Sequence, residues 1–283
     1  MTFLQTFTTA YLIMLIVALA ISASGFIKYV YFISLGYGFS VAAVGIASLI
    51  VFRNTLTLPA VILASLLIVY GCRLGGYLLI REIKSAAYRT TLKQISKDGK
   101  TVNFFAKLGI WIPCALLYIF QVSPVFFRLQ NAAIAAGEGE APAFLSFDAS
   151  SIAGIIILVL GIIIESTADL QKSAAKKKNP KRFCDTGLYK IVRCPNYFGE
   201  ILIWTGVFVS GINVLNGAWQ WVTSAIGYIC IVWIMFGGAR RLEIRQNKNY
   251  GSDPEYQAYV KKTPIILPLI PLYSVEKYKW LVG

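Results

Sequence analysis

Seven apolar runs, each about long enough to cross a bilayer, limit how this chain can fold more than any other feature. They lie near residues 8–25, 30–52, 56–80, 105–127, 147–166, 198–212 and 217–238. A transmembrane α-helix needs roughly 20 consecutive, mostly apolar residues. One such run could be a buried helix of a soluble domain, but seven within 283 residues exclude that class of protein. We therefore predict an all-α, polytopic integral membrane protein with about seven transmembrane helices, forming a single transmembrane domain over residues 1–283.

The composition agrees with this prediction. Charged residues make up 14% of the chain and the mean hydropathy is +0.65, whereas soluble globular proteins carry about 25% charged residues. The first apolar run could also be a signal peptide, but no charged residue precedes Lys28 and the run is long for the apolar part of a signal. We therefore expect it to be a retained helix.

The distribution of basic residues predicts the orientation in the membrane. They gather in the segments 81–107, 172–193 and 240–262, whereas the connections 128–146 and 210–217 are acidic or neutral. Cytoplasmic loops carry the excess of Lys and Arg in membrane proteins, so we expect the N-terminus outside and the C-terminus on the cytosolic or matrix side. The net charge of +14 then indicates contact with anionic membrane lipids and no nucleic acid. Endoplasmic reticulum, mitochondrial inner membrane and bacterial plasma membrane are equally compatible with this pattern.

Several kinds of chemistry are excluded by missing residues. The chain contains no histidine, which removes His-ligated zinc or haem and hydrolysis by a Ser–His pair. The five cysteines lack metal-ligand spacing and fall mostly in apolar segments, so we expect no metal site and no disulfide framework. Neither a G-x-G-x-x-G turn after a strand nor a Walker loop is present, so a nucleotide would have to bind without a Rossmann domain or a P-loop.

Polar residues that share helical faces mark a candidate site. Glu165 and Asp169 are four residues apart, and Lys176 continues their face if the helix persists. Asn196 and Glu200 are also four apart, at the start of the sixth run.

Pro195 suits the first turn of that sixth helix, where its missing N–H costs nothing. The free N–H groups of the helix N-terminus would point toward the basic side of the membrane. Basic residues surround this position, namely Lys176, Lys177, Lys178, Arg182, Arg193, Arg240, Arg241 and Arg245. This pattern predicts a cationic vestibule that would suit a ligand with several phosphates. An ionisable side chain at membrane depth is energetically costly, so we interpret Glu200 as a functional residue of this vestibule.

Three segments carry a family resemblance. Residues 187–202 read GLYKIVRCPNYFGEIL, residues 70–81 read YGCRLGGYLLIR and residues 251–264 read GSDPEYQAYVKKTP. Together they resemble the steroid 5-alpha-reductase superfamily, most closely its branch of reductase-like membrane proteins, over roughly residues 30–270. That superfamily is related in fold to the isoprenylcysteine carboxyl methyltransferases.

The resemblance implies a seven-helix fold that binds NADPH and transfers hydride to a carbon–carbon double bond conjugated with a carbonyl in a lipid-like or steroid-like substrate. It implies that Asn196 and Glu200 hold the nicotinamide amide. The residues implied for the adenosine and phosphate end are Asp169, Lys176, Arg193, Arg240 and Arg241. Tyr70 corresponds to the catalytic tyrosine that donates a hydrogen bond or a proton to the substrate carbonyl.

Two further functions stay open at this point. Steroid-acting members pair the catalytic tyrosine with a glutamate on the second span, whereas this chain has no acid before Glu82 and has Cys194 where a histidine is usual. These differences favour a catalytically inactive accessory subunit that binds other subunits of a membrane complex. An S-adenosylmethionine-dependent lipid methyltransferase is the other alternative, although Glu200 directly after Gly199 favours the reductase branch.

Overall fold

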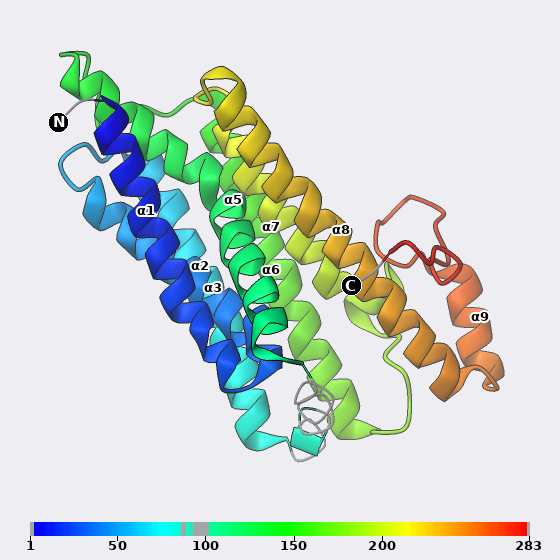
Figure 1. Cartoon of the computed structure of the whole chain (residues 1–283). Helices are drawn as coiled ribbons and strands as arrows, with labels where there is room; N and C mark the ends of the chain where they lie inside the picture. Colours follow the sequence, from blue (N-terminus) through cyan, green and yellow to red (C-terminus); the bar gives the residue numbers. More distant parts are fainter. Residues whose placement is uncertain (1–2, 86–88, 91, 93–101, 282–283) are drawn as a thin grey trace. The chain divides into compact units, whose positions relative to one another are not determined.

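The computed structural model describes residues 3–85, 89–90, 92 and 102–281, and every regular element within them is helical (Figure 1). In chain order these elements are α1 (Phe3–Ser22), the 3-10 turns η1 (Ala23–Phe26) and η2 (Tyr29–Ile33), α2 (Leu35–Val51), α3 (Leu58–Lys84), α5 (Phe104–Gly137), α6 (Ala149–Lys178), the 3-10 turn η3 (Gly187–Lys190), α7 (Pro195–Gly211), α8 (Gly217–Tyr250) and α9 (Pro254–Lys262). Much of the first basic segment, 81–107, lies outside the described residues, namely 86–88, 91 and 93–101.

Five helices are long and apolar enough to cross a membrane, and they indicate an integral membrane protein. The spans are Thr9–Phe26, Leu58–Lys84, Phe104–Gly137, Ala149–Lys178 and Gly217–Tyr250. The other two predicted runs correspond to α2 and α7, which have 17 residues each. At 1.5 Å per residue such a helix is about 25 Å long, somewhat shorter than the roughly 30 Å of a bilayer core. The all-helical prediction is thus confirmed for the described residues, whereas the count of seven spans stays a prediction.

The chain divides into two compact units. Unit 1 comprises Met1–Ile155 with Val207–Gly227, and unit 2 comprises Ile156–Gly206 with Tyr228–Gly283. The boundaries between the units fall within α6, α7 and α8.

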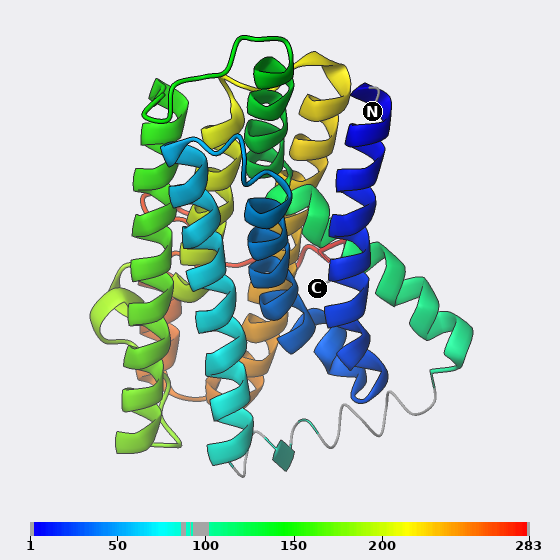
Figure 2. The same cartoon turned by 90° about the vertical axis from the view of Figure 1, so that its left-hand side faces the viewer.

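In unit 1, α2 lies between α1 and α3 (Figure 2), and glycines bring α2 and α3 into backbone contact. A Cβ placed on Gly38 would lie 2.8 Å from the nitrogen of Gly75, and one on Gly71 would lie 2.4 Å from the oxygen of Gly38. Small residues allow this close approach between membrane helices, where dispersion contacts rather than the hydrophobic effect drive packing.

A buried arginine ties together the helix ends on the side of unit 1 that holds the α5–α6 connection. Nη1 of Arg128 lies 2.5 Å from Oδ2 of Asp148, and its Nη2 donates to the carbonyl of Ser210. Burial raises the pKa of Asp148, but hydrogen bonds from Arg128, Ser150 and Ser151 outweigh burial and hold that pKa well below its usual range. The carboxylate is therefore charged at any moderately acidic pH and neutralises the buried guanidinium.

In unit 2, glycines again set the distance between two helices. A Cβ placed on Gly161 of α6 would lie 2.6 Å from the nitrogen of Ile203 on α7. One on Gly199 of α7 would lie 2.7 Å from the nitrogen of Glu165 on α6. The start of α7 is therefore pressed against the acidic face of α6.

Candidate functional site

Tyr70, the predicted catalytic tyrosine, lies on α3 in unit 1 and is fully buried. Its hydroxyl is 3.2 Å from the hydroxyl of Tyr37 on α2. The two tyrosines directly precede Gly71 and Gly38, the glycines that let α2 and α3 touch, so the backbone contact brings the hydroxyls together. Tyr70 therefore has a phenol as neighbour, where the resemblance leads one to expect a carboxylate.

Tyr118 of α5 supports this pair. Its ring centroid lies 5.2 Å from that of Tyr37, and its hydroxyl donates to the carbonyl of Phe32. Offset aromatic pairs at this distance add stabilisation beyond the area they bury. Tyr37 is thus fixed by a neighbouring ring while its hydroxyl contacts Tyr70.

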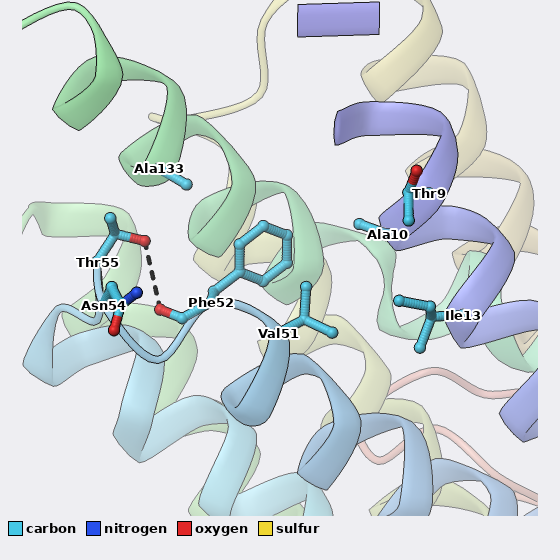
Figure 3. A pocket seen from close by; sticks show the side chains of 8 residues that line it. All are labelled: Thr9, Ala10, Ile13, Val51, Phe52, Asn54, Thr55 and Ala133. Atoms are coloured by element: carbon cyan, nitrogen blue, oxygen red, sulfur yellow. Dashed lines mark hydrogen bonds between the residues drawn. The ribbon is translucent and has the colours of Figure 1, made fainter. Parts of the chain in front are cut away.

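A cavity of about 270 Å³ in unit 1 is a separate feature (Figure 3). Its lining comes from α1, the end of α2, the turn that follows α2, and α5. The lining residues are Thr9, Ala10, Ile13, Val51, Phe52, Asn54, Thr55 and Ala133. None of the predicted site residues is among them, and the polar groups are few, so we do not assign the predicted chemistry to this cavity.

The predicted cofactor residues of α7 lie in unit 2. The helix begins at Pro195, as predicted, and this start places Asn196 in its first turn and Glu200 one turn later. Glu200 is buried. The side-chain oxygen of Asn196 is also buried and has no hydrogen-bond partner among the described residues. An unsatisfied buried carbonyl costs about 1–3 kcal/mol, so this atom is suited to accept a hydrogen bond from a ligand.

Charged residues of α6 flank this part of α7. Glu165 is 3% exposed and packs against Gly199, while Asp169 is half-buried one turn further along α6. Lys172 is close enough to Cys194 to act electrostatically on its thiol. The predicted shared face of Glu165 and Asp169 is therefore directed along the start of α7.

α8 contributes arginines on the other side of α7. The ring of Tyr197 crosses to α8, where its Cζ would lie 3.3 Å from a Cβ on Gly238. The charges of Arg241, Glu200 and Arg245 all act on the Tyr197 hydroxyl. Arg241 and Arg245 are exposed, so their guanidinium groups are accessible to an anionic ligand near the start of α7.

Arg193, a predicted phosphate contact, has a different environment. It is 1% exposed and its Nη2 lies 2.9 Å from Oε1 of Glu243, which is equally buried. Nη2 also donates to the carbonyl of Tyr273, and Oε2 of Glu243 accepts from the backbone N–H of Val275 at 2.9 Å. The pair with Glu243 thus connects the residues before α7 to α8 and the C-terminal segment, while Nε and Nη1 of Arg193 are buried without a hydrogen-bond partner among the described residues.

Lys176 and Arg240 also make contacts within the chain. The ammonium of Lys176 donates to the hydroxyl of Tyr250 at 2.7 Å and to the carbonyl of Arg182 at 2.6 Å. Nε of Arg240 donates to the carbonyl of Glu276 at 3.0 Å. Among the predicted basic contacts, Arg241 is thus the one whose guanidinium is best placed for a ligand.

Cys194, which replaces the usual histidine, is a poor nucleophile. Burial raises the pKa of its thiol to about 12, although the nearby charges of Lys172 and Arg193 partly offset this effect. The thiol is therefore protonated at physiological pH and acts as a small buried side chain.

Two partners of the predicted site residues were not predicted from the sequence. Glu243 lies within the basic segment 240–262, but nothing in the sequence links it to Arg193, fifty residues away. Tyr37 lies in a glycine-rich apolar run, and no sequence feature distinguishes it from the other residues of that run. Only the contact between α2 and α3 shows that it faces Tyr70.

The long apolar helices and the charged cluster around the start of α7 place this chain among helical membrane proteins with a polar site. The family model described as "Protein of unknown function (DUF1295)" matches residues 24–263, and the chain belongs to this family. The chain is 36% identical over 73 residues to steroid 5-alpha-reductase DET2 of Gossypium hirsutum. That match covers 25% of this chain and 26% of the relative, so the similarity spans about a quarter of each. No solved structure matches the chain.

Proposed function

We propose that this protein is an NADPH-dependent reductase of a carbon–carbon double bond conjugated with a carbonyl in a lipid-like substrate. The observation that carries the proposal is the buried side-chain oxygen of Asn196, which has no hydrogen-bond partner within the described part of the chain and lies one turn from the buried carboxylate of Glu200. The local similarity to a steroid 5-alpha-reductase supports the same class of reaction. The basic clusters support an orientation with the start of α7 on the cytosolic or matrix side.

The donors and acceptors at the start of α7 fit the carboxamide of a nicotinamide ring. The N–H groups of that amide would meet the Asn196 oxygen and a Glu200 oxygen, both acceptors on one helical face. Binding would remove the desolvation penalty of the Asn196 carbonyl, which is about 1–3 kcal/mol. The free protein bears the penalty of the unsatisfied Asn196 carbonyl, and NADPH binding is favoured because it removes that penalty.

The remaining charges suit the other end of NADPH. Asp169 is half-buried on the face of α6 that meets α7 and could accept from an adenosine ribose hydroxyl. The exposed guanidinium groups of Arg241 and Arg245 could bind phosphates with paired hydrogen bonds.

Tyr70 would act on the carbonyl group of the substrate. NADPH, when bound, supplies hydride to the β-carbon of an enone, and negative charge then develops on the carbonyl oxygen. By its resemblance to the catalytic tyrosine of the superfamily, Tyr70 would donate a hydrogen bond or proton to that oxygen, and its buried environment would strengthen the interaction. Tyr37, 3.2 Å away, can donate to the Tyr70 oxygen and so stabilise charge on it.

The first experiment measures NADPH binding to the detergent-purified chain by nucleotide fluorescence and thermal shift, with NADH and S-adenosylmethionine in parallel. We expect saturable, micromolar binding of NADPH, weakened about tenfold in each variant. Asn196→Ala removes one acceptor, and Glu200→Gln removes the charge that strengthens the hydrogen bond to the other. Asn179→Ala and Asp185→Asn are matched controls because they make similar changes in the same unit, at an exposed position and at a half-buried loop position outside the start of α7.

The second experiment measures NADPH oxidation with a panel of enone lipids. Tyr70→Phe should leave NADPH affinity unchanged and lower turnover by about 100-fold or more, the usual contribution of a positioned acid. Tyr118→Phe is the control, since it removes a buried hydroxyl of the same unit that contacts a backbone carbonyl.

A folded chain that binds none of the three nucleotides would contradict the reductase and favour an accessory subunit of a membrane complex.

A further inference from the structure

An exposed apolar tip lies in the C-terminal segment of unit 2, which we call the tail (residues 263–281). The tip is the sequence LPLIP at residues 267–271. Leu269 is completely exposed, Ile270 is 49% exposed, and Tyr273 just beyond them is 41% exposed. Leu269 also has a φ of +67°, a left-handed conformation that a leucine adopts only at a cost. Because Leu269 is both strained and exposed to solvent, we infer that its side chain contacts a partner outside the chain.

The tip is held in place by hydrogen bonds and is not a loose end. The N–H of Ile265 donates to the carbonyl of Leu272 at 2.8 Å and closes the loop at its base. The N–H groups of Arg193 and Cys194 donate to the carbonyls of Pro264 and Ile265, each at 2.9 Å. The tip is therefore presented rigidly and is fixed to the two residues that precede α7.

The rest of the tail lies where α8 leaves its apolar stretch (Figure 1). The ring of Trp280 lies 4.9 Å from that of Trp233 on α8, and the carbonyl of Glu276 accepts from Arg240. Trp233 and Arg240 are seven residues apart, about 10 Å along the helix. Tryptophans gather at the boundary between hydrocarbon and headgroups, so this contact places the tail at the membrane interface.

The charges around the tip match an anionic lipid surface. Exposed lysines flank it on both sides, namely Lys261, Lys262, Lys277 and Lys279. The nearest acid, Glu276, is turned toward α8, where its Oε2 accepts from Asn247 at 2.6 Å. Only three side chains, Leu269, Ile270 and Tyr273, form the exposed apolar patch described above, whereas a stable protein interface buries about 800 Å² and about 20–30 residues on each partner. Lipid therefore suits the patch better than a protein.

We propose that the tip at residues 267–271 inserts into the headgroup region of the membrane leaflet on the cytosolic or matrix side and anchors the tail to anionic lipid. Leu269 and Ile270 enter the boundary between headgroups and acyl chains, while the flanking lysines bind the phosphates. Because the tail is hydrogen-bonded to Arg193 and Cys194, the anchor also fixes the start of α7 relative to the bilayer. This inference depends on membrane insertion of the chain and not on its proposed reductase activity.

The test uses the full chain in nanodiscs of phosphatidylcholine and phosphatidylglycerol, with one copy in each disc so that no second protein can cover the tip. Leu269→Cys, Ile270→Cys and Ser274→Cys are each treated with a membrane-impermeant maleimide. Mass spectrometry measures the rate at each introduced cysteine, relative to the same peptide in the denatured chain, which separates these sites from the native cysteines. Ser274 is the matched control because it is an exposed polar residue of the same tail.

We expect the cysteines at positions 269 and 270 to react about tenfold or more slowly than the one at 274, since interfacial apolar groups lie about 5–10 Å below the headgroups. All three variants should unfold at the temperature of the unmutated chain, and position 270 still reports if Leu269→Cys does not fold. Equal rates at the three positions would overturn the proposal and leave the tip as a docking surface for another protein.

Discussion

Removing one partner of the buried Arg193–Glu243 pair should destabilise unit 2 strongly. Both side chains are 1% exposed, and their charged atoms are 2.9 Å apart. Glu243→Leu would leave a buried guanidinium without its counter-charge, which costs about 3–5 kcal/mol. Arg193→Met would strand the carboxylate at a similar cost. Either change is large compared with the 5–15 kcal/mol by which folded proteins are usually stable.

The double variant Arg193→Met/Glu243→Leu should be much less damaging than the two single changes together. It removes both charges, so the main remaining loss is the acceptor of the buried Val275 N–H, worth about 1–3 kcal/mol. The carbonyl of Tyr273 is in an exposed residue and can bond to water instead. The coupling energy of the pair is therefore expected to be at least about 3 kcal/mol.

Denaturant unfolding of the detergent-solubilised chain measures these free energies, and hydrogen exchange of residues 264–281 shows whether the tail is released first. Asp185→Leu is the control, because its partner Arg182 is exposed and water screens that pair. The reasoning fails if each single change costs less than about 1 kcal/mol and the double change equals their sum. Lower NADPH affinity in Arg193→Met with unchanged stability would instead restore Arg193 as a phosphate contact.

Three further predictions follow from packing and charge. Gly199→Leu should destabilise the chain by about 1–3 kcal/mol or more, measured by denaturant unfolding, because its Cβ would lie 2.7 Å from the backbone of Glu165. The Asp148 carboxyl has a lowered pKa in the folded chain, so its pair with Arg128 stabilises the fold above the unfolded pKa of about 3.9 and loses this effect as pH falls through the folded pKa. Thermal unfolding of Asp148→Asn should therefore differ from that of the unmutated chain by a constant amount from pH 7 to about 5, and by less below pH 4. Cys194, with a pKa raised to about 12, should react with iodoacetamide at pH 8 only after unfolding, as peptide mass spectrometry can show.

The helical architecture can be predicted from the sequence because this architecture depends on local properties of the chain. Apolar runs identify the helices, and Pro195, which lacks an N–H, marks the start of α7. That start puts Asn196 and Glu200 on one face of the helix, as expected. The condition under which Lys176 shares the face of Glu165 and Asp169 is met, since all three residues lie within Ala149–Lys178.

The partners of the site residues could not be predicted because they depend on contacts between helices. Arg193 is basic and close to α7 in sequence, which suggests a phosphate contact, but its burial against Glu243 is a tertiary property. Likewise, the contact of Tyr37 with Tyr70 depends on glycines that bring two backbones together. Spacing within a helix shows which residues share a face, but it does not show what that face meets.

A substitution of Asn196 distinguishes the proposed reductase function from the alternative of an inactive accessory subunit. Its buried, unpartnered oxygen costs about 1–3 kcal/mol in the free protein, and a purely structural fold gains nothing from that cost. Asn196→Leu should therefore leave the nucleotide-free chain as stable as before or more stable, within the limits of packing around a half-buried side chain. The same change should abolish the thermal stabilisation that NADPH gives to the unmutated chain. If Asn196→Leu instead destabilises the free chain and leaves any NADPH response intact, the oxygen has a structural partner and the nicotinamide assignment is wrong.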